Sequence, residues 1–213
     1  MYNFRIPPVY RRHREFFVQH QRGFGEDAFH AVWCFIFSQF KPKLCLEIGV
    51  YRGQTISLWS IIARELRVEA SEIWGLSPLT QLGDDVSSYI SIDYEQDIRK
   101  NFKTFSLGEP KLWKESSTTL AGVEFIKSKV WDLIYIDGSH NYEDVSRDFE
   151  NALHSLKHGG LLCLDDSSLY LDYKPRPGRF AGHPGPSRLI KEFCNETIVH
   201  VMTVGHINVL QKI

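Results

Sequence analysis

Acidic side chains follow two apolar runs of the sequence, at points where strands of a sheet would end. Asp137 comes directly after the run 131–136, and Asp165 and Asp166 come directly after the run 161–164. If the two strands are neighbours in a parallel sheet, the three carboxylates meet at one edge and repel one another unless a cation is present. Carboxylate oxygens suit Mg²⁺, Mn²⁺ or Ca²⁺ rather than zinc. These residues form a candidate metal site, the alternative being that each aspartate caps the helix that follows it.

His140 lies three residues after Asp137, in a polar turn before the next amphipathic stretch. Because the unperturbed pKa of histidine lies near neutral pH, His140 could take a proton from a substrate held beside the acids. The alternative is an ordinary surface histidine. The other histidines, including His154 and His158, are expected to be solvated.

A third group of residues, CLEIGVYRGQT at positions 45–55, combines a strand, a glycine-containing turn and the start of a helix. Gly49 and Gly53 permit tight turning and a close approach of a ligand to the backbone, and the helix start offers unpaired amides. The phosphate-binding patterns GxGxxG and GxxxxGK[ST] are absent. Glu47 at the strand end instead suits a ligand that carries a positive charge, with an ordinary strand-to-helix turn as the alternative.

Short apolar runs alternate with longer amphipathic stretches from residue 43 onward, which indicates a parallel sheet covered by helices on both faces. We expect strands over residues 44–48, 73–76, 111–114, 131–136, 161–164, 197–204 and 207–211. We expect helices over residues 26–40, 55–66, 93–105, 120–126, 142–156 and 187–193. Because only Gly205 and His206 separate the last two strands, those strands must form an antiparallel hairpin. The predicted fold class is α/β, a doubly wound and mostly parallel seven-stranded sheet with a C-terminal antiparallel hairpin.

The composition limits the classes of function. The chain has 213 residues, is 43% hydrophobic and 24% charged, and carries a formal net charge of −1. This balance is typical of one compact domain and gives no reason to expect nucleic-acid binding, which needs a basic surface. No apolar stretch approaches the about 20 residues that cross a bilayer, and no apolar signal-peptide core follows the N-terminus. The four cysteines form no CxxC pair and are expected to be structural, so we expect a cytoplasmic protein.

Three runs of the sequence, LEIGVYRGQT, DLIYIDGSHNYEDV and LKHGGLLCLDDS, occur in this order at the ends of predicted strands. Together they resemble the class I S-adenosylmethionine-dependent methyltransferases, in a Rossmann-like fold. They are most similar to the small-molecule O-methyltransferases of the macrocin and mycinamicin sugar-methylating type. The resemblance covers residues 41–213 and implies methylation of a hydroxyl on a sugar or another small hydroxylated metabolite. It is compatible with a homo-oligomer.

The resemblance also implies which residues contact the S-adenosylmethionine cofactor. The residues assigned to cofactor binding are Glu47, Gly49, Gly53, Ser77 and Asp137. Ser77 departs from the family pattern, because an acidic residue at the end of the second strand usually holds the ribose hydroxyls there. A serine hydroxyl makes a neutral and weaker hydrogen bond, and Asp84 or Asp85 in the next loop could replace the missing acid.

By the same resemblance, the metal is Mg²⁺ and its ligands are Asp137, Asp165 and Asp166. His140 matches the family's general base, and we assign it and Asp137 to catalysis. Residues 41–213 are then the methyltransferase domain. Residues 1–40 are an N-terminal helical extension that begins irregularly, with Arg11, Arg12 and Arg14 in a polar turn.

Two other classes of protein share parts of this pattern. A nicotinamide-dependent oxidoreductase also begins with a strand, a glycine turn and a helix, but the missing GxGxxG and the missing acid after the second strand count against it. A non-catalytic module that keeps the fold and binds the cofactor or another ligand is favoured only by Ser77.

The segment 170–186 is rich in proline and glycine and is expected to be a long loop at the ligand-binding edge of the sheet. Basic residues are concentrated in and just after it: Lys174, Arg176, Arg179, Arg188 and Lys191. The loop could close over an acceptor that carries a phosphate or carboxylate. The alternative is a solvated basic loop without a function of its own.

Overall fold

A computed structural model describes residues 7–23, 27–68, 71–81, 89–168, 182–193 and 196–213. The strands are β1 (Leu44–Ile48), β2 (Glu72–Leu76), β3 (Lys111–Trp113), β4 (Trp131–Ile136), β5 (Leu156–Leu164), β6 (Ile198–Val204) and β7 (Ile207–Lys212). The helices are α1 (Pro8–Gln19), α2 (Asp27–Phe40), α3 (Gln54–Glu65), α4 (Tyr94–Thr104), α5 (Leu120–Lys127), α6 (Tyr142–Ser155) and α7 (Pro184–Glu192).

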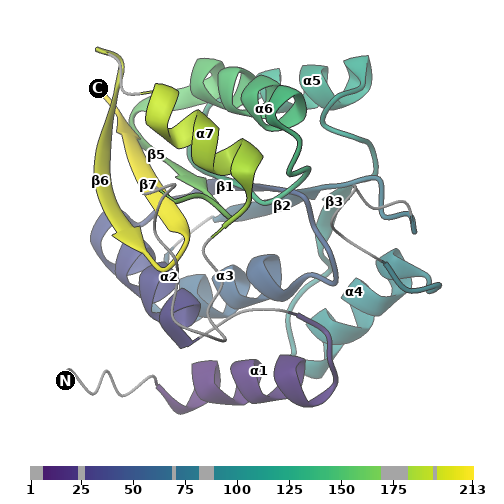
Figure 1. Ribbon diagram of the computed structural model, residues 1–213. Helices are drawn as coiled ribbons and strands as arrows, with labels where there is room; N and C mark the ends of the chain where they lie inside the picture. Colours follow the sequence, from purple (N-terminus) through teal and green to yellow (C-terminus); the bar gives the residue numbers. More distant parts are fainter. Residues whose placement is uncertain (1–6, 24–26, 69–70, 82–88, 169–181, 194–195) are drawn as a thin grey trace, which may run out of the picture.

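The seven strands form one sheet in the order β3-β2-β1-β4-β5-β7-β6 (Figure 1). The first five strands are parallel, and β7 pairs antiparallel with both β5 and β6. The strand order reverses direction at β1, so a crevice opens between the carboxyl ends of β1 and β4. The predicted fold class is confirmed, including the terminal hairpin.

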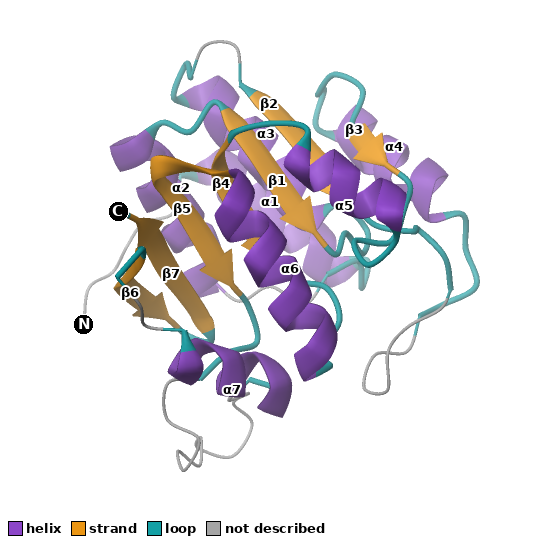
Figure 2. Ribbon diagram, turned by 90° about the horizontal axis from the view of Figure 1, so that it is seen from above, coloured by secondary structure: helices purple, strands orange, loops and turns teal. Residues whose placement is uncertain are grey.

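Helices cover both faces of the sheet. Figure 2 shows α5, α6 and α7 in front of the sheet and α1 to α4 behind it. Neighbouring residues of one strand bury their side chains on opposite faces: Cys45 belongs to the core on the α3 side, and Leu46 belongs to the core on the α6 side. This two-sided burial explains why the central strands are continuously apolar in the sequence.

The prediction of a polar turn at Arg11, Arg12 and Arg14 is wrong, because these residues lie in α1. Proline near the start of this helix is favourable, since its missing N–H would have no partner in the first turn. The buried side chains Tyr10, His13 and Phe17 follow helical spacing and face the core. The interspersed arginines obscured this apolar stripe.

Among the elements that were predicted, two boundaries differ from the prediction by more than one residue, the starts of β5 and α7. Helix α6 ends at Ser155 and β5 begins at Leu156, because the strand continues through Gly159 and Gly160 with a shift of register against β4. Helix α7 begins at Pro184, three residues earlier than expected. Most of the long loop lies outside the described residues, and so do Lys174, Arg176 and Arg179.

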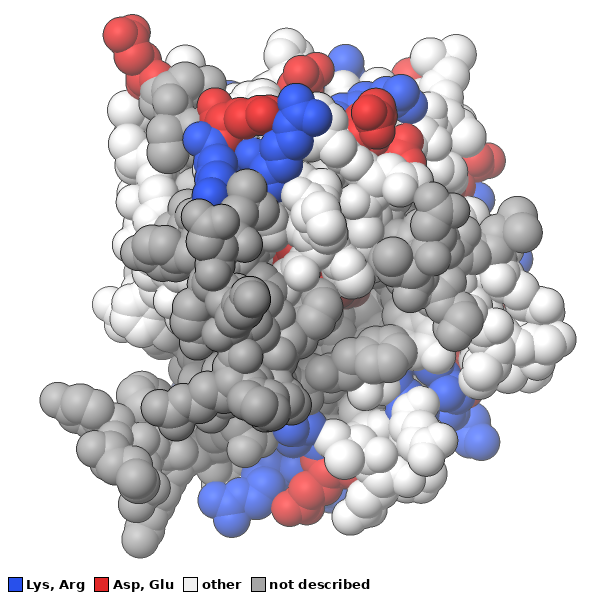
Figure 3. All heavy atoms as spheres, in the orientation of Figure 1, with Lys and Arg blue, Asp and Glu red and all other residues white. Residues whose placement is uncertain are grey.

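The described surface carries charges of both signs. On the face in Figure 3, lysine and arginine side chains lie beside aspartate and glutamate side chains at the top and at the bottom. None of the helices in the described ranges is long and apolar enough to cross a membrane. Among the cysteines in those ranges, Cys45 and Cys163 are buried and Cys34 is half-buried, and all three are free thiols.

Helix α2 contributes directly to the core, which gives a test of its role. Trp33 is fully buried against Trp59 and Tyr135, whereas Phe35 on the same helix is 45% exposed. Trp33→Ala should lower the free energy of unfolding by about 3–5 kcal/mol, because it leaves a large cavity. Phe35→Ala, the matched control, should change it by less than about 0.5 kcal/mol. Urea unfolding would measure both, and equal effects would contradict the described packing.

Candidate active site

The carboxyl ends of β4 and β5 bring the predicted acids together. These strands are neighbours, and the backbone N–H of Asp165 donates to the carbonyl of Ile136 at 3.0 Å. The Tyr135 hydroxyl donates to a carboxylate oxygen of Asp165 and lies 3.3 Å from one of Asp137. Asp166 follows in the left-handed backbone region, with a φ of 49°. The structure thus brings Asp137 and Asp165 to one hydroxyl and places Asp166 next to Asp165. Among the described residues, the groups whose possible ligand atoms lie within 4.8 Å of one another are Asp165, Asp166 and His206, and His140, Asp166 and His183, without Asp137.

These carboxyl groups are costly to ionise together. Burial raises the pKa of Asp137 well above its usual value, and the nearby charges of Asp165 and Asp166 raise it further. Burial also raises the pKa of Asp165, against the opposing effect of a hydrogen bond from His206. A bound cation would relieve this repulsion, so the cluster has the chemistry of a cation site.

Three histidines surround the acids. The Nε2 atom of His140 lies 2.7 Å from Asp166 Oδ2, and the Nδ1 atom of His206 lies 2.8 Å from Asp165 Oδ1. The His183 ring lies 4.1 Å from the His140 ring, measured between centroids. The sequence predicted His140 but missed His183 and His206. The sequence did contain a signal for His206, which is its place in the predicted hairpin turn. Because β7 runs antiparallel to β5, the turn that precedes β7 lies at the edge of the sheet where β5 ends.

The glycine turn after β1 packs directly against the acidic edge. Gly49 has a φ of 99°, and a Cβ atom there would lie 2.0 Å from the carbonyl oxygen of Asp137. Gly53 has a φ of 75° at the N-cap of α3, where an added Cβ would lie 2.9 Å from Ile98. Both glycines are required by backbone geometry and close packing.

Glu47 lies one strand away from the acids. Its side chain is buried and bonded to the Thr55 hydroxyl and the Ile56 backbone amide, and burial raises its pKa to about 8. Its Oε2 atom has no hydrogen-bond partner among the described residues. A buried carboxylate oxygen with unused acceptor capacity suits a positively charged ligand group.

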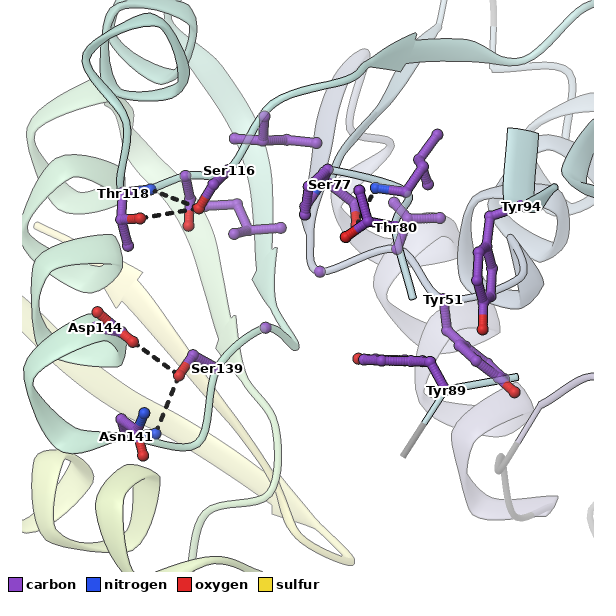
Figure 4. A pocket seen from close by; sticks show the side chains of 18 residues that line it. Tyr51, Ser77, Thr80, Tyr89, Tyr94, Ser116, Thr118, Ser139, Asn141 and Asp144 are labelled. Carbon is purple, nitrogen blue, oxygen red and sulfur yellow. Dashed lines mark hydrogen bonds between the residues drawn. The ribbon is translucent and has the colours of Figure 1, made fainter. Parts of the chain in front are cut away.

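A pocket opens beside the acidic cluster, with a volume of about 270 Å³. One wall carries the aromatic rings of Tyr51, Tyr89 and Tyr94, and the opposite wall carries polar side chains that include Ser139 and Asp144 (Figure 4). The backbone at 138–139 borders both this pocket and the acidic cluster. Asp137, His140, Asp165 and Asp166 line a smaller neighbouring cavity, which shares only residues 138 and 139 with the pocket.

Ser77 lines the same pocket at the end of β2, as predicted, and its hydroxyl accepts from the Leu79 amide at 3.5 Å. An acidic residue of this pocket, Asp144, lies on the wall that faces Ser77, and its carboxylate accepts a hydrogen bond from the Ser139 hydroxyl at 3.0 Å. Sequence reasoning missed Asp144, because it lies in the first turn of α6, where acidic residues are common for helix stability alone. Asp84 and Asp85 lie outside the described residues.

The segment after α1 is tied to the glycine turn by one shared carboxylate. Asp97 on α4 accepts from Arg22 at 2.8 Å and from Arg52 at 2.6 Å. Arg52 also donates to the carbonyl of Gln21 at 3.2 Å, and its own carbonyl accepts from Asn101 at 2.7 Å. The N-terminal segment thus braces the loop that carries Gly49 and Gly53.

This strand order, with a glycine turn after β1 and acids after β4 and β5, is matched by known proteins. Residues 46–167, more than half of the chain, match the family described as "Methyltransferase domain". The chain belongs to this family, so the prediction of a methyltransferase is confirmed. No curated protein matches the sequence.

Solved structures of methyltransferases share the fold. A putative caffeoyl-CoA O-methyltransferase from Staphylococcus aureus is similar with a TM-score of 0.66 and 15% identity, over 96% of this chain and 92% of that one. A methyltransferase from Podospora anserina bound to SAH has a TM-score of 0.65 and 18% identity, over 97% of this chain and 88% of that one. An O-methyltransferase from Bacillus cereus in complex with SAH has a TM-score of 0.65 and 15% identity, over 99% of this chain and 94% of that one. The expected Rossmann-like methyltransferase fold is confirmed.

The raised pKa of Glu47 predicts a pH-dependent stability. Between its ordinary value of 4.5 and about 8, the folded chain keeps a proton on Glu47 that the unfolded chain releases. The free energy of unfolding therefore falls as pH rises through this range. Glu47→Gln should remove the contribution of this group and leave those of Asp137 and Asp165, so the slope should be shallower and the variant should gain stability relative to the parent between pH 5 and 8. Urea unfolding at several pH values would show this, with exposed Glu124→Gln as a control that keeps the parent's slope.

Proposed function

We propose that this methyltransferase transfers the methyl group of S-adenosylmethionine to a hydroxyl oxygen of a sugar or another small hydroxylated metabolite. In this proposal Mg²⁺ binds at the acidic cluster and His140 is the general base. The observation that carries the proposal is the place of His140, hydrogen-bonded to Asp166 at the border between the acids and the pocket. A base, a cation site and a ligand pocket then meet at one edge of the sheet.

The pocket has the features that the cofactor needs. When bound, S-adenosylmethionine supplies an electrophilic methyl group on a sulfonium. Glu47 would accept a hydrogen bond from the ammonium of its methionine part, because its buried Oε2 has no partner among the described residues. Gly49 lines the pocket with backbone alone, and Gly53 would hold the turn in shape at the start of α3. Ser77 lines the pocket, and Asp137 lines the smaller cavity that shares residues 138 and 139 with it. The SAH-bound state of the Podospora anserina and Bacillus cereus structures supports this assignment.

The residues present also fit a divalent cation. Asp137, Asp165 and Asp166 offer oxygen atoms, the ligand type that Mg²⁺ prefers. A cation bound there would lower the pKa of a hydroxyl group that contacts it. The raised pKa of Asp137 and Asp165 without a cation is the observation that supports this fit.

His140 is placed to accept the proton that the acceptor hydroxyl loses. If its Nε2–H donates to Asp166, the lone pair lies on Nδ1, and the carboxylate stabilises the imidazolium that forms. Asp166 also fixes the ring orientation. A sugar hydroxyl is a poor nucleophile until deprotonated, so a base together with a cation favours such an acceptor over one that is already acidic.

Replacement of His140 tests its assigned role. His140→Ala should reduce turnover at least about 100-fold, because general-base catalysis typically contributes that much. Binding of S-adenosylhomocysteine should stay within a few-fold of the parent. His154→Ala, on the exposed end of α6, is the matched control and should leave both unchanged. Formation of S-adenosylhomocysteine with a panel of sugars and hydroxylated metabolites measures turnover, and full activity of His140→Ala would refute the role.

A calorimetric titration tests the cofactor and the metal separately. S-adenosylhomocysteine should bind the parent protein at micromolar concentrations, and Mg²⁺ should bind or strengthen binding in a way that Asp165→Ala abolishes. Absence of cofactor binding under both conditions would mean that Ser77 does not replace the missing acid. Cofactor binding without turnover on any acceptor would favour a non-catalytic module on the same fold.

A further inference from the structure

The terminal hairpin brings a histidine to the acidic cluster. Strand β7 runs antiparallel to β5 and pairs Asn208 with Leu164, so the turn before β7 lies where β5 ends. His206 occupies that turn, and its ring lies 5.6 Å from the Phe29 ring between centroids. The imidazole is therefore positioned by two elements that do not carry the aspartates.

The backbone around His206 is fixed to the loop that carries the acids. The amide of Ser167 donates to the His206 carbonyl at 2.9 Å. The buried Asn208 donates to the Ser167 hydroxyl at 2.7 Å and to the Ser167 carbonyl at 3.1 Å. These bonds leave the histidine little freedom to move away from Asp165 and Asp166, which is the preorganisation that a ligand needs.

The distances from His206 match those between adjacent metal ligands. Its Nδ1 atom lies 2.8 Å from Asp165 Oδ1 and 3.2 Å from Asp166 Oδ1. In octahedral coordination with bonds of about 2.1 Å, adjacent ligand atoms lie about 3.0 Å apart. Ligand atoms of Asp165, Asp166 and His206 all lie within 4.8 Å of one another. One cation could contact all three residues.

The described structure supplies no lysine or arginine to the two acids that face His206. Within the described ranges, the ion pairs of Asp165 and Asp166 involve only histidines. A cation bound between these two carboxylates and His206 would therefore displace no basic lysine or arginine side chain.

We propose that His206 is a metal ligand through Nδ1, which makes the site a mixed nitrogen and oxygen site that prefers Mn²⁺, Fe²⁺, Co²⁺ or Zn²⁺ over Mg²⁺. Imidazole nitrogen suits these transition metals, whereas Mg²⁺ prefers oxygen ligands alone. The inference rests on the metal site of the proposed function but not on the reaction. It assigns a ligand from the hairpin in addition to the three aspartates, and it changes the identity of the preferred ion.

Metal binding without cofactor or acceptor tests the inference. The parent should bind Mn²⁺ at least about tenfold more tightly than Mg²⁺, and His206→Asn should lose most of that preference. Spin-echo spectra of bound Mn²⁺ should show nitrogen modulation from one imidazole in the parent and none in His206→Asn. The exposed His158→Asn on β5 is the matched control and should behave as the parent. Thermal unfolding of each variant shows whether it is folded.

The opposite role for His206 gives the opposite result. If the histidine were only a protonated counter-ion of Asp165 and Asp166, it would compete with the metal, and His206→Asn would bind Mn²⁺ equally well or better. That outcome, or nitrogen modulation that persists in His206→Asn, overturns the inference and leaves the proposed magnesium site intact. Failure of the parent to bind any divalent ion overturns both metal assignments, while the cofactor titration still tests methyl transfer.

Discussion

The repulsion among buried carboxyl groups at the ends of β4 and β5 is the constraint on which the rest of this structure depends. Asp137 and Asp165 are held together by strand register and by the hydroxyl of Tyr135, although burial and nearby negative charge disfavour their ionisation. A fold keeps such an arrangement only if the backbone around it is firmly determined. The continuous burial of the central strands on both faces supplies that rigidity.

The neighbouring parts of the molecule serve the same edge. The turn after β4 borders the ligand pocket and carries His140, so the predicted base and the predicted cofactor site share a short piece of backbone. On the other side, α1 and α2 pack against α3 in the same core. These two helices therefore stabilise the face of the sheet that leads to the site.

The sequence predicted what depends on local pattern. Apolar runs buried on both faces identified the strands, and an acid directly after such a run identified Asp137 and Asp165. It failed where the decisive relation is between distant segments. Helix α1 was missed because arginines interrupt its buried stripe at Tyr10, His13 and Phe17. His206 was missed because only the pairing of β7 with β5 brings a hairpin turn to the acids.

The contact between Gly49 and Asp137 has a consequence for how such a protein can diverge. Because a Cβ atom at position 49 would overlap the carbonyl of Asp137, a larger residue there must displace the strand end that carries the carboxylate. Selection acting on the glycine turn is thereby also selection on the acidic edge. The two must therefore evolve as a unit.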